Sequence, residues 1–340
     1  IDCPASALNN AGQEPGGRAD NVVRVKKIQT AQGTFPYVSA QAFRYWWRTT
    51  LERMPGWNAS PIVREQKVAY TNAEPTAYDD DDLFGYMRAA SKKAGARSED
   101  LDVGIPATRD LTRPSPLRVG TLVSLGPVRI VDDFGTMARH EGDPVPHEHE
   151  FYRATLAAPF SLDLVAAGTF FVSNRVGLRN LDDERIARAR AAGATEVTVR
   201  GQPALRLPAE TRARRVSALL RALGELQGGA KLTLHYTDVA PSVVVAALVA
   251  GGNHPFLRWF RAGVRGEPEV VPQAVEQTLE VFGTELASPV RVGWQAGYLD
   301  AEREKLQAIL PSAQFSHPRE ALNSLADELA NPEHPVWQQV

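Results

Sequence analysis

The pattern of apolar and polar positions predicts an amphipathic helix early in the chain. Helical spacing of residues 39–54 gathers apolar side chains and a threonine on one broad face, which consists of Phe43, Trp46, Trp47, Thr50 and Met54. The opposite face carries Gln41, Arg44, Tyr45, Arg48 and Glu52. Ser39 is a favourable N-cap, because its hydroxyl can accept a backbone N–H of the first turn. We therefore expect Trp46 and Trp47 to be buried and Arg44 and Arg48 to face outward.

A basic strand is predicted just before this helix. The run Val22-Val23-Arg24-Val25-Lys26-Lys27-Ile28 is β-branched and cationic, and a turn around Gly33 and Pro36 separates it from the helix. A helix N-terminus beside guanidinium groups suits a phosphate or another anion. The same pattern is also typical of an ordinary amphipathic helix with a solvated charged face. Both interpretations stay open on the pattern alone.

Further strands and helices follow from the periodicity of the remaining chain. Strands are expected at 117–131 and at 151–173, the latter broken near Pro159, with a loop at 132–150 between them. The later elements are a hairpin at 195–209, a helix at 208–226, a strand at 231–250, a helix at 268–287, a strand at 290–294 and a polar C-terminal helix. Once insertions are set aside, the order is strand, helix, strand, strand, helix, strand. This is the split βαβ arrangement of ferredoxin-like and RNA-recognition folds, so we predict one elaborated α+β domain over 1–340.

Charge and cysteine content narrow the function classes. The formal charge of −2 argues against a uniformly basic nucleic-acid binder and leaves room only for local patches. One such patch is residues 18–53, and another is 175–221, which holds eleven Arg and no Lys. The second is either a solvated surface or a set of phosphate contacts. The single Cys3 fits a reducing, cytoplasmic compartment, and no run approaches the length of a membrane span. Because the chain opens on Ile1, we expect some residues to precede it.

Three acidic or histidine-bearing segments are candidates for a metal or catalytic site. Asp79–Asp82 is interpreted as an acidic first helical turn or a solvated loop rather than a metal site, because consecutive helical residues point in different directions. His147 and His149 are spaced to share one face of a strand near His140, but no third zinc ligand stands at a recognised spacing, which favours a surface loop. Asp20 is a turn residue, a general base or a metal ligand. No G-x-S-x-G nucleophile motif and no phosphate-binding loop motif occurs in the sequence.

Several longer stretches together carry a family resemblance. They are LNNAG, DNVVRVKKIQT and GTFPYVSAQAFRYWWRTTLE near the N-terminus, DDLFGYM at 81–87, RPSPLRVGTLVSL at 113–125, FYRATLAAPFSLDL at 151–164 and GGNHPF at 251–256. The chain resembles the DevR-type backbone subunits of type I CRISPR surveillance complexes, of a I-B-like kind. The resemblance covers most of the chain up to about residue 260 and is weaker over 265–340.

The resemblance implies an RNA-recognition-type palm at about 1–56, 117–173 and 208–250, a finger-like insertion at about 57–116 and a thumb at about 174–209. It implies a non-catalytic protein without cofactor or metal, whose copies assemble head to tail along a guide RNA. The further implied partners are the target DNA strand in the heteroduplex and other CRISPR effector subunits, with no membrane. The implied RNA-binding residues are Lys26, Lys27, Ser39, Gln41, Arg44, Arg48, Arg200, Arg206, Asn253 and His254.

The same resemblance supplies the main alternative. Backbone subunits of related type III complexes carry an aspartate in the loop before the basic strand and cleave target RNA with the help of a metal ion. Asp20 falls near that position, so a metal-dependent endoribonuclease is the alternative function. A transcriptional regulator is a further alternative, although no helix-turn-helix pattern supports it.

Overall fold

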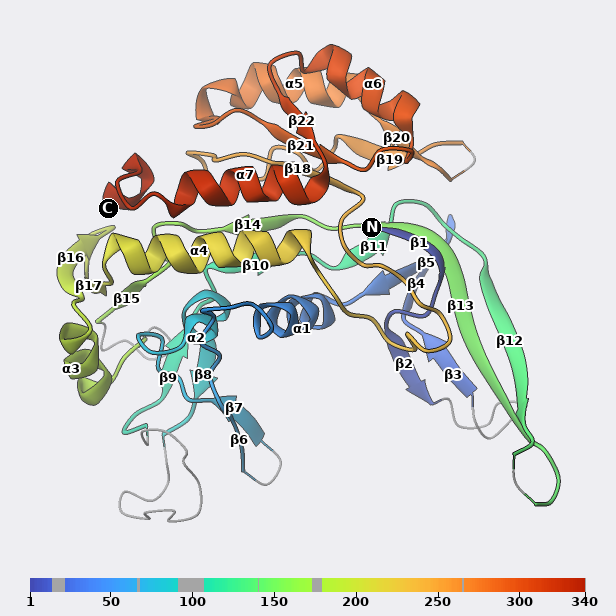
Figure 1. The fold of residues 1–340 in the computed structure, drawn as a ribbon, viewed down its shortest axis with the longest axis horizontal. Coiled ribbons are helices and arrows are strands. Elements are labelled where there is room, and N and C mark those ends of the chain that lie inside the picture. Colours follow the sequence, from blue (N-terminus) through green and yellow to red (C-terminus); the bar gives the residue numbers. More distant parts are fainter. Residues whose placement is uncertain are drawn as a thin grey trace. The chain divides into compact units, whose positions relative to one another are not determined.

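The computed structural model confirms a mixed α/β chain and describes residues 1–13, 22–65, 68–90, 107–139, 141–172, 179–264 and 266–339 (Figure 1). Its contacts divide the chain into two compact units. Unit 1 combines 1–50, 119–159 and 221–324, and unit 2 combines 51–118, 160–220 and 325–340. The finer division into palm, finger and thumb stays a prediction.

Unit 1 is built on an eight-stranded sheet with the order β2-β3-β13-β11-β5-β4, in which β1 and β12 also pair with β13. The strands are β1 (Asp2–Ser6), β2 (Asn10–Gln13), β3 (Val22–Val25), β4 (Lys27–Thr30), β5 (Gly33–Val38), β11 (Leu122–Ser124), β12 (Ile130–Met137) and β13 (Val145–Ala157). The pairing of β13 with β3 is parallel, whereas β1, β11 and β12 run antiparallel to β13. The long strand β13 is thus the centre of the sheet.

The expected loop at 132–150 is wrong, because most of it belongs to a long hairpin. β12 and β13 pair continuously from Ile130 with Tyr152 to Met137 with Val145. β12 is exposed along most of its length, so the hairpin does not need the alternating apolar pattern that marks a half-buried strand. Cross-strand hydrogen bonds, rather than burial, define the two strands here.

Helix α1 (Ala40–Leu51) follows β5 and confirms the predicted amphipathic pattern. Trp46 and Trp47 are 4% and 0% exposed, and Phe43 and Thr50 are also buried. A Cβ atom on Gly228 would lie 2.2 Å from the Trp46 ring, which shows how closely the backbone of that loop approaches the indole. The two tryptophans are therefore core residues that fix the helix.

The C-terminal part of unit 1 forms a second, smaller layer of strands and helices. A three-stranded sheet orders β18 (Val243–Ala246), β21 (Arg291–Trp294) and β22 (Gln314–Ser316), and a two-stranded sheet pairs β19 (Phe260–Ala262) with β20 (Pro268–Val270). The helical segments are α5 (Pro272–Phe282), η1 (Gly283–Glu285), α6 (Asp300–Ile309) and the N-terminal part of α7 (Pro318–Ala330). Their core includes Trp259, Val275 and Leu306. The strand predicted over 231–250 is confirmed only at β18, because most of 231–242 is turn and loop.

Unit 2 is assembled from small sheets and helices. The helices are α2 (Asp79–Phe84), α3 (Asp183–Ala191), most of α4 (Ala209–Gly224), the C-terminal part of α7 and η2 (Pro335–Gln338). The strand pairs are β6 (Ile62–Glu65) with β7 (Val68–Thr71), β8 (Tyr86–Arg88) with β9 (Leu111–Arg113), and β10 (Leu117–Val119) with β14 (Phe160–Leu162). A three-stranded sheet orders β15 (Thr169–Phe171), β17 (Gln202–Arg206) and β16 (Thr195–Val199). The predicted hairpin is confirmed, and its turn residues Arg200 and Gly201 both have positive φ, as a tight two-residue hairpin turn requires.

The four consecutive aspartates form the first turn of α2, as one of our interpretations predicted, but they are not solvated. Asp79, Asp80, Asp81 and Asp82 are all at most 1% exposed. Asp79 accepts hydrogen bonds from Arg214 and Arg215, and Asp82 accepts from Arg113 and Arg215. Asp80 and Asp81 accept from the backbone N–H groups of Ser60 and Glu74. A buried charge requires partners, and here the partners lie far away in the sequence.

The arginine-rich segment 175–221 supplies two of these partners, Arg214 and Arg215, and places further arginines in the interior of unit 2. Arg185, Arg212 and Arg215 are at most 1% exposed. Arg212 donates to the carbonyls of Leu164, Ala167 and Trp337. For these arginines, both predicted roles, a solvated surface and a phosphate contact, are wrong.

Candidate nucleic-acid interface

The outward side of α1 brings two guanidinium groups close together. Arg44 and Arg48 are one helical turn apart and both are half-buried. Burial, together with the neighbouring charge of Arg48, lowers the pKa of Arg44 to about 10. Arg44 still carries its proton at neutral pH, and like charges in a partly dry environment repel each other. An anion bound at this face would relieve that repulsion and accept charge-assisted hydrogen bonds.

The N-terminus of α1 lies beside this pair along the helix. The hydroxyl of Ser39 accepts a hydrogen bond from the Ala42 N–H at 3.4 Å, which confirms its role as N-cap. Gln41 is exposed in the first turn, and Tyr45 is 62% exposed one turn later. The amide of the exposed Gln41 and the positive end of the helix dipole extend the anion-binding character of the face.

Asn9 connects the basic strand to this helix, a role that our sequence reasoning missed. Its side-chain oxygen accepts the Ser39 N–H at 3.0 Å, and its backbone oxygen accepts the Lys26 N–H at 2.8 Å. Lys26 also accepts the Tyr37 N–H at 3.0 Å, and its side chain is half-buried. These bonds hold Lys26 next to the start of α1. Asn9 lies in the LNNAG stretch, but a loop asparagine alone gives no sign of such a bridge.

Two other cations of the basic strand, Arg24 and Lys27, form ion pairs within the chain. The Lys27 ammonium lies 2.5 Å from a carboxylate oxygen of Glu150. Arg24 lies 2.8 Å from Asp132, 3.0 Å from Glu148 and 3.5 Å from Glu150. The acidic residues of the β12–β13 hairpin therefore neutralise part of the positive charge that the sequence shows. Among the predicted strand contacts, Lys26 is better placed than Lys27 for an external anion.

The remaining predicted RNA-binding residues lie in different surroundings. Asn253 is exposed and His254 is half-buried, with its ring edge-on to Phe256 at 5.8 Å between centroids. Arg200 is exposed in the β16–β17 turn. Arg206 is only 7% exposed and donates to Thr169 and to the backbone of Gln339, and burial lowers its pKa. Because Arg206 is buried, it is not available for an external anion.

The histidine pair of β13 has a geometry that was predicted only in part. His147 and His149 share one face, with stacked rings 6.4 Å apart, but they lie in a strand and not in the expected loop. The Nε2 atoms of His149 and His235 are 2.8 Å apart. Burial, followed by the charges of Lys231 and His235, lowers the pKa of His149. His140 lies outside the described residues.

No group of three or more His, Cys, Asp or Glu side chains within the described ranges is arranged to hold a metal ion. Asp20 lies outside these ranges, so the alternative that assigns it a catalytic role stays a prediction. Within the same part of the chain, no helix combines the length and the apolar character needed to cross a bilayer.

Comparison with known proteins adds a family and a fold. The sequence model of the family described as "CRISPR-associated negative auto-regulator DevR/Csa2" matches residues 3–257. A chain of a "CRISPR RNA-guided surveillance complex, pre-nicking" superposes with a TM-score of 0.54 at 12% identity, covering 96% of this chain and 97% of that one. A chain of a "CRISPR RNA-guided surveillance complex" gives a TM-score of 0.49 at 12% identity, with coverage of 95% and 97%.

None of the curated proteins compared with the chain matches it. At 12% identity the structural likeness to the pre-nicking complex shows a shared fold, whereas the match of the family model extends over most of the sequence. The chain belongs to the DevR/Csa2 family of CRISPR-associated proteins.

Proposed function

We propose that this protein is a non-catalytic backbone subunit of a CRISPR RNA-guided surveillance complex that binds the guide RNA through its phosphates. The observation that carries the proposal is the pair Arg44 and Arg48 on the outward face of α1. Burial and the neighbouring charge lower the pKa of Arg44 there. Ser39 and Lys26, joined through Asn9, place a capped helix N-terminus and a further cation beside the pair.

Contacts of this kind suit a guide RNA, whose sequence differs from one complex to the next. Phosphate contacts fix position and carry no sequence information, whereas base contacts would restrict the guides that can bind. Trp46 and Trp47 are buried, so neither indole of α1 is available to stack on a base. The bases would remain free to pair with a target DNA strand.

We also propose that several copies of this protein assemble head to tail along one guide RNA. The assembly would contact other effector subunits. Support comes from the fold shared with a chain of a surveillance complex described as RNA-guided. Asn253 and His254, in the GGNHPF stretch, remain predicted RNA contacts of unit 1.

The salt dependence of RNA affinity tests the proposed grip. The double variant Arg44→Ala/Arg48→Ala should bind single-stranded guide RNA about a hundredfold more weakly, since each lost charged hydrogen bond contributes roughly 1.5 kcal/mol. The slope of log K against log salt should become shallower by about 1.4, that is, about 0.7 per phosphate contact. Fluorescence anisotropy over a range of salt concentrations measures both quantities.

The matched control is Lys305→Ala/Arg319→Ala, which removes two exposed cations of unit 1 away from α1. This variant should keep the wild-type slope. If the α1 variant keeps both affinity and slope while remaining folded, the guide phosphates do not bind at Arg44 and Arg48.

A further inference from the structure

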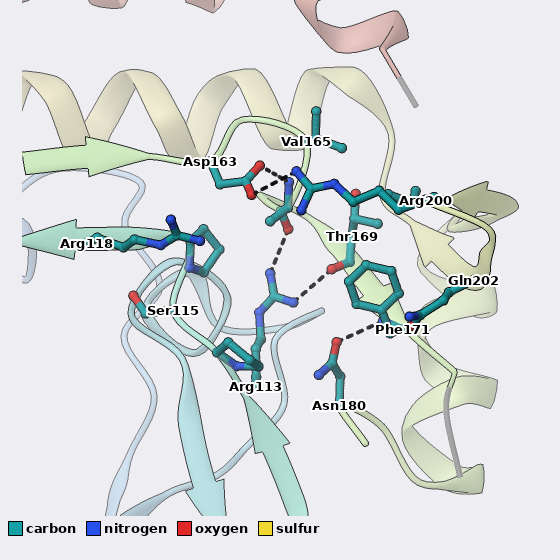
Figure 2. A pocket seen from close by; sticks show the side chains of 14 residues that line it. Arg113, Ser115, Arg118, Asp163, Val165, Thr169, Phe171, Asn180, Arg200 and Gln202 are labelled. Atoms are coloured by element: carbon teal, nitrogen blue, oxygen red, sulfur yellow. Dashed lines mark hydrogen bonds and ion pairs between the residues drawn. The ribbon is translucent and has the colours of Figure 1, made fainter. Parts of the chain in front are cut away.

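Unit 2 contains a cavity of about 280 Å³ beside the β16–β17 hairpin (Figure 2). The apolar part of its lining comes from Pro114, Pro116, Val165, Phe171 and Val199. Cavities lined mainly by apolar side chains, with a few polar groups at defined places, are typical of binding sites. The proposed RNA-binding face of α1 contributes no residue to this cavity.

The polar side chains deep in the lining are already engaged within the chain. The Asn180 side chain accepts from the Phe171 N–H at 2.8 Å and donates to the Thr112 carbonyl at 2.9 Å. Arg113 donates to the carbonyls of Thr169 and Ala166 at 2.8 and 2.9 Å, as well as to Asp82. The interior of the cavity therefore offers apolar surface rather than free hydrogen-bonding groups.

The mouth of the cavity is different, because it carries the charged groups. Arg118 is exposed and forms no ion pair with another side chain in the described part of the chain, and Arg200 is 73% exposed. Figure 2 shows these two arginines on either side of Asp163, whose carboxylate lies 3.7 Å from the Arg200 guanidinium. Two guanidinium groups and one carboxylate give the mouth a net charge of one positive unit. A single carboxylate of a ligand would balance it.

The backbone fixes the position of both groups at the mouth. Asp163 accepts a hydrogen bond from the Ala166 N–H at 3.0 Å, which restrains its carboxylate. Arg200 has a φ of +51° in the turn that it shares with Gly201, so the hairpin determines where its side chain starts. A site whose groups are already in place loses less conformational entropy on binding.

We propose that this cavity is a docking site for a segment of a partner protein. The segment would insert one bulky apolar side chain, aromatic or branched, into the cavity and place a neighbouring carboxylate at its mouth, where the two positive charges of Arg118 and Arg200 exceed the one negative charge of Asp163. This arrangement matches the anchor-in-pocket contacts that dominate protein interfaces, with a charged contact at the rim. It gives Arg200 a protein ligand in place of the guide RNA that the sequence suggested.

A nucleotide is the competing ligand, and the lining argues against it. A nucleobase in the cavity would bury its donors and acceptors against proline, valine and phenylalanine side chains. Buried polar groups without partners cost free energy, so the apolar interior favours an apolar side chain.

Short fluorescent Gly/Ser peptides with a central Glu-Phe-Asp or Glu-Leu-Asp test the proposal by anisotropy with the full chain. At least one of them should bind, and replacing its apolar residue by Ser or its acids by Lys should abolish binding. Arg118→Glu/Arg200→Glu should weaken binding about tenfold or more, because it opposes the peptide carboxylates with like charge. Val165→Trp should also weaken it, by filling the cavity while leaving the charges in place.

The control Arg64→Glu/Arg109→Glu reverses two exposed charges of unit 2 outside the cavity and should bind the peptide as the wild type does. The proposal is overturned if neither peptide binds, or if the cavity variants and the control bind equally well. It is also overturned if adenosine monophosphate binds at Arg118 and Arg200 and the acidic peptides do not, since the cavity would then be a nucleotide site.

Discussion

Replacing Asp82 by Asn tests whether the buried aspartates of α2 hold unit 2 together. Asp82 is fully buried and accepts hydrogen bonds from Arg113, from Arg215 at 2.8 Å and from the Gly168 N–H at 3.0 Å. Asn has the same shape but no charge, and its NH₂ group faces a donor. Among the described residues, Asp82 is the carboxylate that pairs with Arg113, so Arg113 loses that partner, while Arg215 keeps Asp79.

The expected loss of folding free energy follows from the burial of the Asp82–Arg113 ion pair. Breaking a buried ion pair by removing one partner costs about 3–5 kcal/mol, because the remaining charge is left uncompensated in the interior. We expect the melting temperature of unit 2 to fall by roughly 10 °C, at about 2–4 °C per kcal/mol for a unit of this size. Differential scanning calorimetry measures the shift. Hydrogen exchange should show the protection loss around 79–84, 113 and 166–168.

Glu184→Gln is the matched control. Glu184 is 51% exposed and pairs with Arg188 one helical turn away at 3.3 Å. An exposed pair of this kind contributes less than about 1 kcal/mol, so the melting temperature should hardly change. A Glu184→Gln shift as large as that of Asp82→Asn, or a wild-type melting temperature for Asp82→Asn, would refute the assignment of the aspartates as a structural centre.

Three further predictions concern unit 1 and the alternative function. Gly228→Ala should destabilise the chain by about 1–3 kcal/mol by forcing Trp46 aside, whereas Gly252→Ala, which meets no atom within 4 Å, should unfold at the wild-type temperature in the same melting assay. The pKa of His149 in the folded chain lies below its ordinary 6.5. Its contribution to stability is therefore present above about pH 6.5 and is lost as the pH falls. His149→Gln should make the melting temperature depend less on pH in this range. Guide-complementary RNA should remain intact with the assembled complex and Mg²⁺; cleavage that disappears in Asp20→Ala would establish the ribonuclease alternative instead.

Periodicity predicted the elements whose one face is buried. The position and the buried side of α1 were predicted correctly from the helical spacing of its apolar residues, which include Trp46 and Trp47. The turn at Arg200 and Gly201 was equally predictable from strand runs on both sides of a glycine. By contrast, β12 is exposed for most of its length and carries no such mark.

The sequence could not reveal which acidic and basic side chains pair with each other. Asp82 and Arg215 are 133 residues apart, and Lys27 and Glu150 are 123 apart. Nothing in local spacing shows that Asp79–Asp82 would be buried or that Lys27 would be neutralised. The candidate site was therefore predicted correctly in its helix and its cap, but Asn9 was missed and Arg206 proved to be buried.

The RNA that accompanies the purified protein tests the central claim most directly. If Arg44 and Arg48 bind guide phosphates, the wild-type protein should co-purify with short RNA of uniform length. Arg44→Ala/Arg48→Ala should lose that RNA, while Lys305→Ala/Arg319→Ala retains it. Wild-type protein free of RNA when expressed with its guide, or equal RNA content in both variants, would contradict the account.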